Sequence, residues 1–286
     1  MKDIDIEFSN KFDQLNQLLI KHQIKFGNYQ TFPRLFYDKF KNKISTKYSV
    51  NQISLDYARY DFLLKNIKLE NLSVVEYGSN LGFFCLSIVQ DFNSITTGYE
   101  ALGDYCKCAK IISELMDCEN RTNFFNRSIK TGDIMKLENA DLLVELNVLH
   151  HAGSFFDEEY VKKNSDWRNY ALKRLSIIRK KYKKFFFQTG NMLNNQALFP
   201  AENSVYYIRS ILEEAEWKIK KIGMVSDLSS PDLKYLPYDL EDINDIPQYK
   251  CRRDNKSNKV LYQNVKTKEY YYLKTGLANR PLWICE

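Results

Sequence analysis

The chain has 286 residues, of which 44% are hydrophobic and 27% are charged, and its formal net charge is +6. This balance excludes an intrinsically disordered chain, which combines low hydrophobicity with high net charge. It also disfavours a dedicated nucleic-acid-binding protein, because such a protein usually carries a denser concentration of Lys and Arg. We therefore expect a folded protein with a substantial hydrophobic core.

The sequence contains no sign of a membrane span, a signal peptide or a metal site. No apolar stretch reaches the roughly 18 residues that a transmembrane helix needs, and the first residues are acidic and amphipathic. The six cysteines have neither the paired spacing of zinc ligands nor that of a disulfide framework. We expect a cytoplasmic protein with reduced cysteines and no metal ion.

The N-terminal quarter of the chain, residues 1–70, is expected to be mainly helical. Apolar residues follow helical spacing between 12 and 19 and again between 55 and 67. Between them, the aromatic stretch 26–40 is interrupted by a glycine and a proline, which predicts a loop or a short helix. We interpret residues 1–70 as a helical cap or lid.

Residues 71–225 alternate between strand-like and helical segments. The short apolar runs that we interpret as strands are 73–78, 94–100, 122–129, 140–151, 184–190 and 217–225. Helical periodicity fills most of the intervening stretches. The alternation predicts an α/β fold, doubly wound, in which helices cover both faces of a parallel sheet. Residues 226–279 break this rhythm with more proline and charge, and residues 280–286 are strand-like again.

A polar loop follows the first predicted strand, in the stretch VVEYGSNLGFFCLSIV. Glu76, Gly78 and Gly82 stand where a strand ends and a helix begins, and a parallel sheet binds its ligands at this edge. The glycines allow close approach to a ligand, and the helix N-terminus offers N–H groups. Glu100 ends the second predicted strand, where a carboxylate accepts both hydroxyls of a ribose. A nucleoside is the expected ligand.

The loop departs from the fingerprint of dinucleotide-binding proteins, which is G-x-G-x-x-G. Asn80 stands where a glycine would admit a pyrophosphate. This departure disfavours an NAD-dependent oxidoreductase. Glu76 instead suits a ligand whose amino-acid end carries an ammonium group, or it accepts hydrogen bonds from neighbouring backbone N–H groups.

The pattern Glu76-x-Gly78-x-x-x-Gly82, the carboxylate of Glu100 and the run DLLVELNVLHH together resemble the class I S-adenosylmethionine-dependent methyltransferases. The resemblance covers about 70–225 and the terminal strand. It implies a seven-stranded sheet whose last, antiparallel strand is 280–286. Residues 226–279 are then an inserted segment on the substrate side, which with residues 1–70 helps to select the acceptor.

The resemblance also implies which residues hold S-adenosylmethionine. Glu76 and the loop contact the methionine part, Glu100 the ribose, and residues after the third strand the adenine, where either Ser128 with Ile129 or Asp133 matches. Arg59, in the helix before the first strand, lies within reach of the methionine carboxylate. The expected cofactor-binding residues are Arg59, Glu76, Gly78, Ser79, Asn80, Gly82, Glu100, Ser128, Ile129, Asp133 and Asn147. By position alone, Tyr29, Gln188 and Asn191 are further lining residues.

Two adjacent histidines, His150 and His151, end the fourth predicted strand near the expected methyl group. One of them is expected to act as the general base for a hydroxyl acceptor, or one of them only orients the loop. On a strand, adjacent side chains face opposite sides, so only one would point at the acceptor. Glu145 lies in the same apolar run, and we expect it to have a basic partner or a position near solvent, because burial alone is costly.

This end of the strand looks most like methyltransferases of bacterial surface sugars, and more distantly like enzymes that carboxymethylate wobble uridine in tRNA. We therefore expect O-methylation of a sugar or another small polar acceptor. The first alternative is an RNA methyltransferase, which requires the basic stretches 174–184 and 250–259 to converge on the pocket; a solvated helix face and a solvated loop are simpler explanations. The second is a catalytically inactive nucleoside-binding partner subunit. The oligomeric state is left open.

Overall fold

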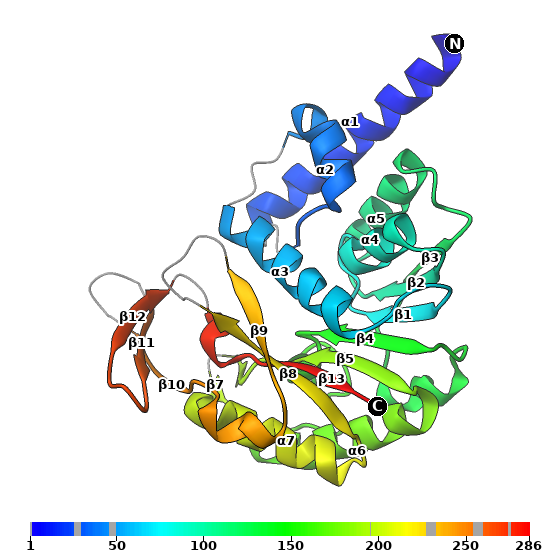
Figure 1. Cartoon of the computed structure of the whole chain (residues 1–286). Coiled ribbons are helices and arrows are strands. Elements are labelled where there is room, and N and C mark those ends of the chain that lie inside the picture. Colours follow the sequence, from blue (N-terminus) through cyan, green and yellow to red (C-terminus); the bar gives the residue numbers. More distant parts are fainter. Residues whose placement is uncertain are drawn as a thin grey trace. The chain divides into compact units, whose positions relative to one another are not determined.

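The computed structural model describes residues 2–25, 30–45, 50–194, 196–226, 233–253, 260–273 and 276–286. The chain is a mixed α/β protein with a large, mainly parallel sheet, as predicted (Figure 1). It divides into two compact units. The first unit comprises Met1–Tyr60 and Lys68–Ser128, and the second comprises Asp61–Ile67 and Ile129–Glu286. The predicted division into 1–70, 71–225, 226–279 and 280–286 stays a prediction.

The first unit contains three parallel strands in the order β3-β2-β1. They are β1 (Ser73–Tyr77), β2 (Ile95–Glu100) and β3 (Thr122–Asn126). Two helices connect them, α4 (Phe83–Asp91) and α5 (Gly103–Leu115). Helix α4 is buried from Phe83 to Val89, which explains why its sequence is apolar on every face rather than along one stripe.

The N-terminal helices are α1 (Lys2–Lys25), α2 (Arg34–Phe40) and α3 (Val50–Asn66), with a 3-10 turn at Lys41–Lys43, and α3 belongs to the first unit as far as Tyr60. Phe12, Leu15 and Leu19 of α1 are buried in one cluster with residues of α5. Each of these side chains contributes roughly 1.5–3 kcal/mol through its burial. Lys21 of α1 also pairs with Asp104 of α5 at 2.6 Å. Packing of this extent attaches α1 to the body of the first unit.

The second unit contains the strands in the order β4-β5-β13-β8-β9. They are β4 (Leu142–Leu146), β5 (Lys184–Gln188), β8 (Ile219–Ser226), β9 (Lys234–Tyr238) and β13 (Leu282–Cys285). The predicted antiparallel terminal strand is confirmed, because Trp283 of β13 lies opposite Phe187 of β5 and Ile222 of β8, both antiparallel. Strand β9, which the sequence analysis did not anticipate, extends the edge.

The remaining elements of the second unit are two helices, short strands and 3-10 turns. Helices α6 (Trp167–Lys181) and α7 (Ser204–Glu214) lie along one side of its strands (Figure 1). Strands β10 (Tyr249–Arg253), β11 (Val260–Asn264) and β12 (Tyr270–Leu273) form a separate antiparallel sheet from the predicted insertion. Strands β6 (Met192–Leu193) and β7 (Gln196–Ala197) pair with each other. The 3-10 turns are η2 (Thr131–Lys136), η3 (Leu149–His151), η4 (Asn164–Asp166), η5 (Ala201–Asn203), η6 (Glu241–Asp245) and η7 (Gly276–Asn279).

A buried ion pair joins β4 to α6. Glu145 and Arg174 are both fully buried, with Arg174 Nη2 2.9 Å from Glu145 Oε2. Arg174 Nη1 also donates a hydrogen bond to the backbone oxygen of Ile129 at 3.1 Å. The basic partner expected for Glu145 is confirmed. The expectation that the basic run from 174 lies on a solvated face is wrong for Arg174, because the buried carboxylate requires a buried counter-charge.

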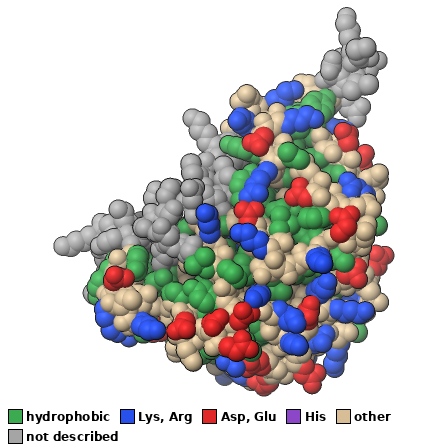
Figure 2. Space-filling view, in the orientation of Figure 1, with side chains coloured by type: hydrophobic (Ala, Val, Ile, Leu, Met, Phe, Trp, Pro, Cys, Tyr) green, Lys and Arg blue, Asp and Glu red, His purple; other side chains and the backbone are tan. Residues whose placement is uncertain are grey.

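The charged side chains on the surface are of both signs. Figure 2 shows Lys and Arg side chains interspersed with Asp and Glu over the face that it presents. Among the residues that the structure describes, no helix is long and apolar enough to cross a membrane. Cys85, Cys106, Cys108, Cys118 and Cys285 are buried free thiols.

Candidate functional site

The loop between β1 and α4 has a backbone that few residues other than glycine adopt. Gly78, Asn80 and Gly82 have φ values of 70°, 49° and 81°. Asparagine tolerates this left-handed region better than most residues, which explains Asn80. At Gly82 space is also limiting, because an added Cβ would lie 2.8 Å from the Phe124 ring. The loop is therefore held in one conformation at the N-terminus of α4.

Glu76 is the residue before the last of β1, two positions before Gly78 of this loop. Its side chain is 2% exposed, and its Oε2 accepts a hydrogen bond from the backbone N–H of Cys85 at 3.3 Å. Burial raises the pKa of Glu76 to about 8, and the nearby carboxylates Glu100 and Asp56 add to the rise. The carboxyl of Glu76 is therefore protonated and neutral near pH 7 in the ligand-free protein. A ligand that brings a positive charge would favour its ionised form.

Glu100 ends β2 and faces the same loop. Its Oε2 accepts the N–H of Asn80 at 2.8 Å, and its Oε1 accepts the N–H of Leu102 at 2.8 Å. Burial raises the pKa of this carboxyl too, while these backbone hydrogen bonds oppose the rise. Each oxygen of a carboxylate has a second lone pair. Glu100 is therefore fixed in position and still able to accept hydrogen bonds from a pair of vicinal hydroxyls.

Arg59 comes from α3 and is buried beside Asp56. Its Nη1 lies 3.1 Å from Asp56 Oδ1, and Asp56 Oδ2 accepts the N–H of Thr31 at 2.8 Å. Arg59 Nε is buried and makes no hydrogen bond within the part of the chain that the structure describes. The hydroxyl of Ser79 is fully buried, and it too makes no hydrogen bond to any described residue. Buried polar atoms without partners are costly, and a ligand that supplies the partners removes that cost.

Gln30 contacts the start of α4, beside the candidate site, and the sequence analysis did not predict this. Its Oε1 accepts the N–H of Phe83, the first residue of α4, at 3.1 Å. No local pattern indicated it, because Gln30 is distant in the sequence from Phe83. Asp56 was missed as well, although an Asp and an Arg three residues apart on an apolar helix face are a detectable signal of a buried pair. Tyr29 lies outside the described residues.

A second group of polar side chains surrounds the end of β4 in the second unit. Asn147, with φ of 59°, accepts a hydrogen bond from Arg280 Nη1 at 3.1 Å through its Oδ1. Its amide nitrogen donates to Gln188 Oε1 at 3.1 Å. Gln188 Nε2 donates in turn to the backbone oxygen of Arg280 at 2.7 Å. These hydrogen bonds connect β4, β5 and the segment before β13, and we call Asn147, His150, His151, Gln188 and Arg280 the histidine cluster.

The two histidines lie on the 3-10 turn η3 rather than on a strand. The expectation that they face opposite sides is wrong, because strand alternation does not apply there and their ring centroids are 4.1 Å apart. His150 Nδ1 accepts the N–H of Gly190 at 3.1 Å, so the proton of the neutral ring is on Nε2. Burial, with the charge of Arg280, lowers the pKa of both rings. Both imidazoles are therefore neutral near pH 7.

The imidazole of His151 differs from that of His150 in its hydrogen bonding. It makes no hydrogen bond to any residue that the structure describes, whereas Nδ1 of His150 accepts the N–H of Gly190. His151 is also less buried, and its ring packs edge-on against Phe155 at 5.1 Å. A nitrogen of His151 is thus available to accept a proton, whereas Nδ1 of His150 is occupied by the N–H of Gly190.

The residues expected near adenine occupy neighbouring positions in the chain. Ser128 is half-buried at the end of the first unit, and Ile129 is buried at the start of the second. Asp133 is half-buried on η2. Both assignments stay open as predictions.

Arg280, which the sequence analysis did not single out, follows the inserted segment and carries no motif that would have marked it.

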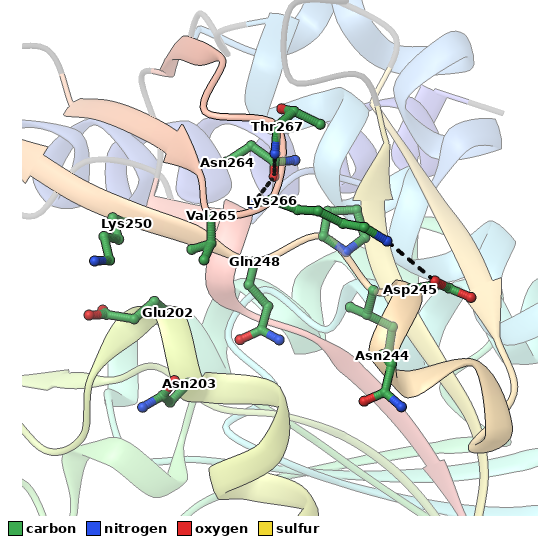
Figure 3. A pocket seen from close by; sticks show the side chains of 12 residues that line it. Glu202, Asn203, Asn244, Asp245, Gln248, Lys250, Asn264, Val265, Lys266 and Thr267 are labelled. Atoms are coloured by element: carbon green, nitrogen blue, oxygen red, sulfur yellow. Dashed lines mark hydrogen bonds and ion pairs between the residues drawn. The ribbon is translucent and has the colours of Figure 1, made fainter.

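The structure also contains a pocket that none of the predicted site residues lines, as far as the chain is described (Figure 3). Its volume is about 550 Å³. The lining comes from η5, from the segment 244–250 and from the turn 264–267, all in the second unit. Most of it belongs to the predicted insertion.

No protein-family model matches the chain. No curated protein matches it either. Among solved structures, a crystal structure of WbdD matches with a TM-score of 0.51 and 16% sequence identity, covering 87% of this chain and 52% of that one. Another structure, of "the bifunctional kinase-methyltransferase WbdD", has a TM-score of 0.50 and 15% identity, with 87% and 53% covered. The chain has the class I methyltransferase fold.

This chain spans about half the length of the WbdD chains that it matches. Magnesium protoporphyrin IX methyltransferase from Synechocystis, with bound S-adenosylhomocysteine, has a TM-score of 0.46 and 14% identity, covering 68% of this chain and 90% of that one. Within the class I fold of this protein, the first unit brings together Arg59, Glu76, Gly78, Ser79, Asn80, Gly82 and Glu100. The second unit brings together Asn147, His150 and His151.

Proposed function

We propose that the protein is an S-adenosylmethionine-dependent methyltransferase that methylates a hydroxyl oxygen of a sugar or another small polar acceptor. The observation that carries this proposal is the arrangement around the loop 78–82 in a class I fold. Two buried carboxylates, Glu76 and Glu100, bracket the loop, and both receive backbone N–H groups from its surroundings. One suits an ammonium group and the other suits vicinal hydroxyls.

The residues of the first unit fit the amino-acid end of this cofactor. Arg59 offers its buried Nε to a carboxylate, and Asp56 holds its guanidinium in place. Glu76, once ionised, offers an acceptor to the ammonium group. The hydroxyl of Ser79 offers one more buried hydrogen-bonding group. When bound, S-adenosylmethionine supplies a methyl group activated by its sulfonium charge.

The histidine cluster supplies the proton chemistry that a hydroxyl acceptor requires. The free nitrogen of His151 would accept the proton that the acceptor hydroxyl loses, and S-adenosylmethionine, when bound, would supply the methyl group and leave as S-adenosylhomocysteine. His150, held by Gly190, and Asn147, held by Arg280 and Gln188, keep the turn η3 in place. A neutral imidazole at pH 7 is required for this role, and burial secures it by lowering the pKa of His151.

Calorimetric titration with S-adenosylhomocysteine tests the cofactor assignment, with NADH as the control ligand. We expect a dissociation constant in the micromolar range, about −8 kcal/mol. Glu100→Ala should weaken binding at least about tenfold, roughly 1.4 kcal/mol, whereas Glu119→Ala, at an exposed position, should not. Failure of the folded protein to bind S-adenosylhomocysteine would refute the proposal. Binding without transfer to any acceptor in a screen would favour an inactive partner subunit instead.

An RNA acceptor receives no comparable support. On the face shown in Figure 2, basic side chains alternate with acidic ones, and a phosphate backbone requires an excess of basic groups. The stretch 174–184 does not supply that excess as a unit, because Arg174 is buried in its ion pair with Glu145. Steep salt dependence of acceptor binding would nevertheless reverse this preference.

A further inference from the structure

The pocket in Figure 3 lies between η5 and the inserted segment, and its lining is balanced in charge. Glu202 and Asp245 are its acidic residues, and Lys250 and Lys266 are its basic residues. Lys266 Nζ lies 3.6 Å from Asp245 Oδ1, so these two charges offset each other. A site for phosphate or another polyanion collects unpaired Lys and Arg. The balance in this pocket therefore favours a ligand without net charge.

Amide side chains supply the other polar groups of the pocket. The side chains of Asn203 and Gln248 make no hydrogen bond to any residue that the structure describes. In Figure 3 the amide of Gln248 points toward the part of the pocket where Asn203 and Asn244 lie. Asn244 Oδ1 accepts the hydroxyl of Tyr206 at 3.0 Å, which orients its amide nitrogen as a donor. Each amide offers both donors and an acceptor.

The pocket also has an apolar part. Ile246, Pro247 and Val265 contribute to its lining beside the amides. The side chain of Asn264 is occupied in its own turn, since its Oδ1 accepts the N–H groups of Lys266 and Thr267. The Oδ1 of Asn264 therefore stabilises the turn 264–267 and is already occupied by the turn's own N–H groups. A ligand that fits this lining has a hydroxyl-rich edge and a C–H face, and a pyranose ring has both.

We propose that this pocket binds a neutral oligosaccharide and holds an extended acceptor. The proposal rests on the proposed function, because it names the class of acceptor as a saccharide chain rather than a single small molecule. The volume of about 550 Å³ accommodates one or two sugar rings. The inserted segment, residues 226–279, supplies most of the lining, and its role would then be to select the acceptor.

Saturation-transfer NMR with three neutral trisaccharides, maltotriose, mannotriose and N-acetylchitotriose, tests this proposal. We expect at least one of them to bind, and the double variant Asn203→Ala/Gln248→Ala to weaken that binding at least tenfold. Asn123→Ala, which removes an exposed amide from β3 in the other unit, serves as the matched control and should bind as the wild type does. Thermal unfolding and titration with S-adenosylhomocysteine should give the same values for all three proteins.

The outcomes separate this inference from the proposed function. If the wild type binds S-adenosylhomocysteine but none of the three trisaccharides, the oligosaccharide site is wrong and the methyltransferase proposal stands. Trisaccharide binding that persists in the double variant also overturns the site. Preferential binding of tripolyphosphate at this pocket, lost in the same variant, would show that it is an anion site instead.

Discussion

Replacing Glu76 by glutamine should stabilise the protein at high pH and weaken its binding of the cofactor. The pKa of Glu76 rises from 4.5 to about 8 on folding, because its carboxyl is buried. Between these two values the folded state holds the carboxyl neutral while the unfolded state ionises it. Folding takes up a proton in this window, so stability falls as pH rises through it, and the loss is complete above about pH 8.

The magnitude follows from the same two values. At about 1.4 kcal/mol for each pH unit, the difference amounts to roughly 4–5 kcal/mol at the upper end of the window. Glu76→Gln keeps a side-chain oxygen for the N–H of Cys85 but cannot ionise. Its free energy of unfolding should match that of the wild type near pH 4.5 and exceed it progressively toward pH 8.

Urea denaturation at pH 5, 7 and 9 measures this difference, with Glu119→Gln as an exposed control that should show none. A difference between Glu76→Gln and wild type that does not change with pH would refute the reasoning about the buried carboxyl. Titration with S-adenosylhomocysteine then separates stability from function. The glutamine variant should bind more weakly than the wild type, and the difference should grow as pH rises toward 8, because the wild-type carboxyl ionises more readily there and the glutamine cannot offer a negative charge to the ammonium group.

Three further perturbations test other parts of the structure. Arg174→Met should lower the free energy of unfolding by about 3–5 kcal/mol, because it leaves the Glu145 carboxylate buried without its counter-charge. In urea denaturation, the double variant Glu145→Gln/Arg174→Met should recover most of that stability. Equal losses for the two variants would contradict the buried pair. His151→Ala should lower kcat about 10²- to 10⁴-fold without changing S-adenosylhomocysteine affinity. As pH is lowered, wild-type activity should fall only below the pH at which an ordinary imidazole becomes protonated, because the pKa of His151 is lowered. Gly82→Ala should cost about 1–3 kcal/mol in thermal unfolding, because a left-handed backbone and the Phe124 ring both oppose a side chain; an unchanged melting temperature would argue against the loop conformation.

Local pattern was sufficient to predict seven strands of the large sheet and the loop that follows β1, but not β9 or the short strands outside that sheet. Apolar runs alternating with amphipathic segments predict an α/β fold, because each strand must bury both faces and each helix one. Glu76, Gly82 and Glu100 could be proposed as site residues for the same reason, since they lie at or next to the ends of predicted strands. The terminal strand 280–286 was likewise recognisable from its apolar run together with the resemblance to the class I family.

Contacts between distant parts of the chain could not be predicted in this way. Gln30 reaches α4, Arg280 reaches Asn147, and Arg174 turns inward to Glu145, and no local periodicity encodes these pairings. The histidines were located but their geometry was not, because a strand assignment was extended through a 3-10 turn. The sequence by itself thus determined the elements and the residues at their ends, which depend on neighbours along the chain. Only the tertiary structure decided which buried charges pair and which amides line a pocket, because those depend on groups brought together by folding.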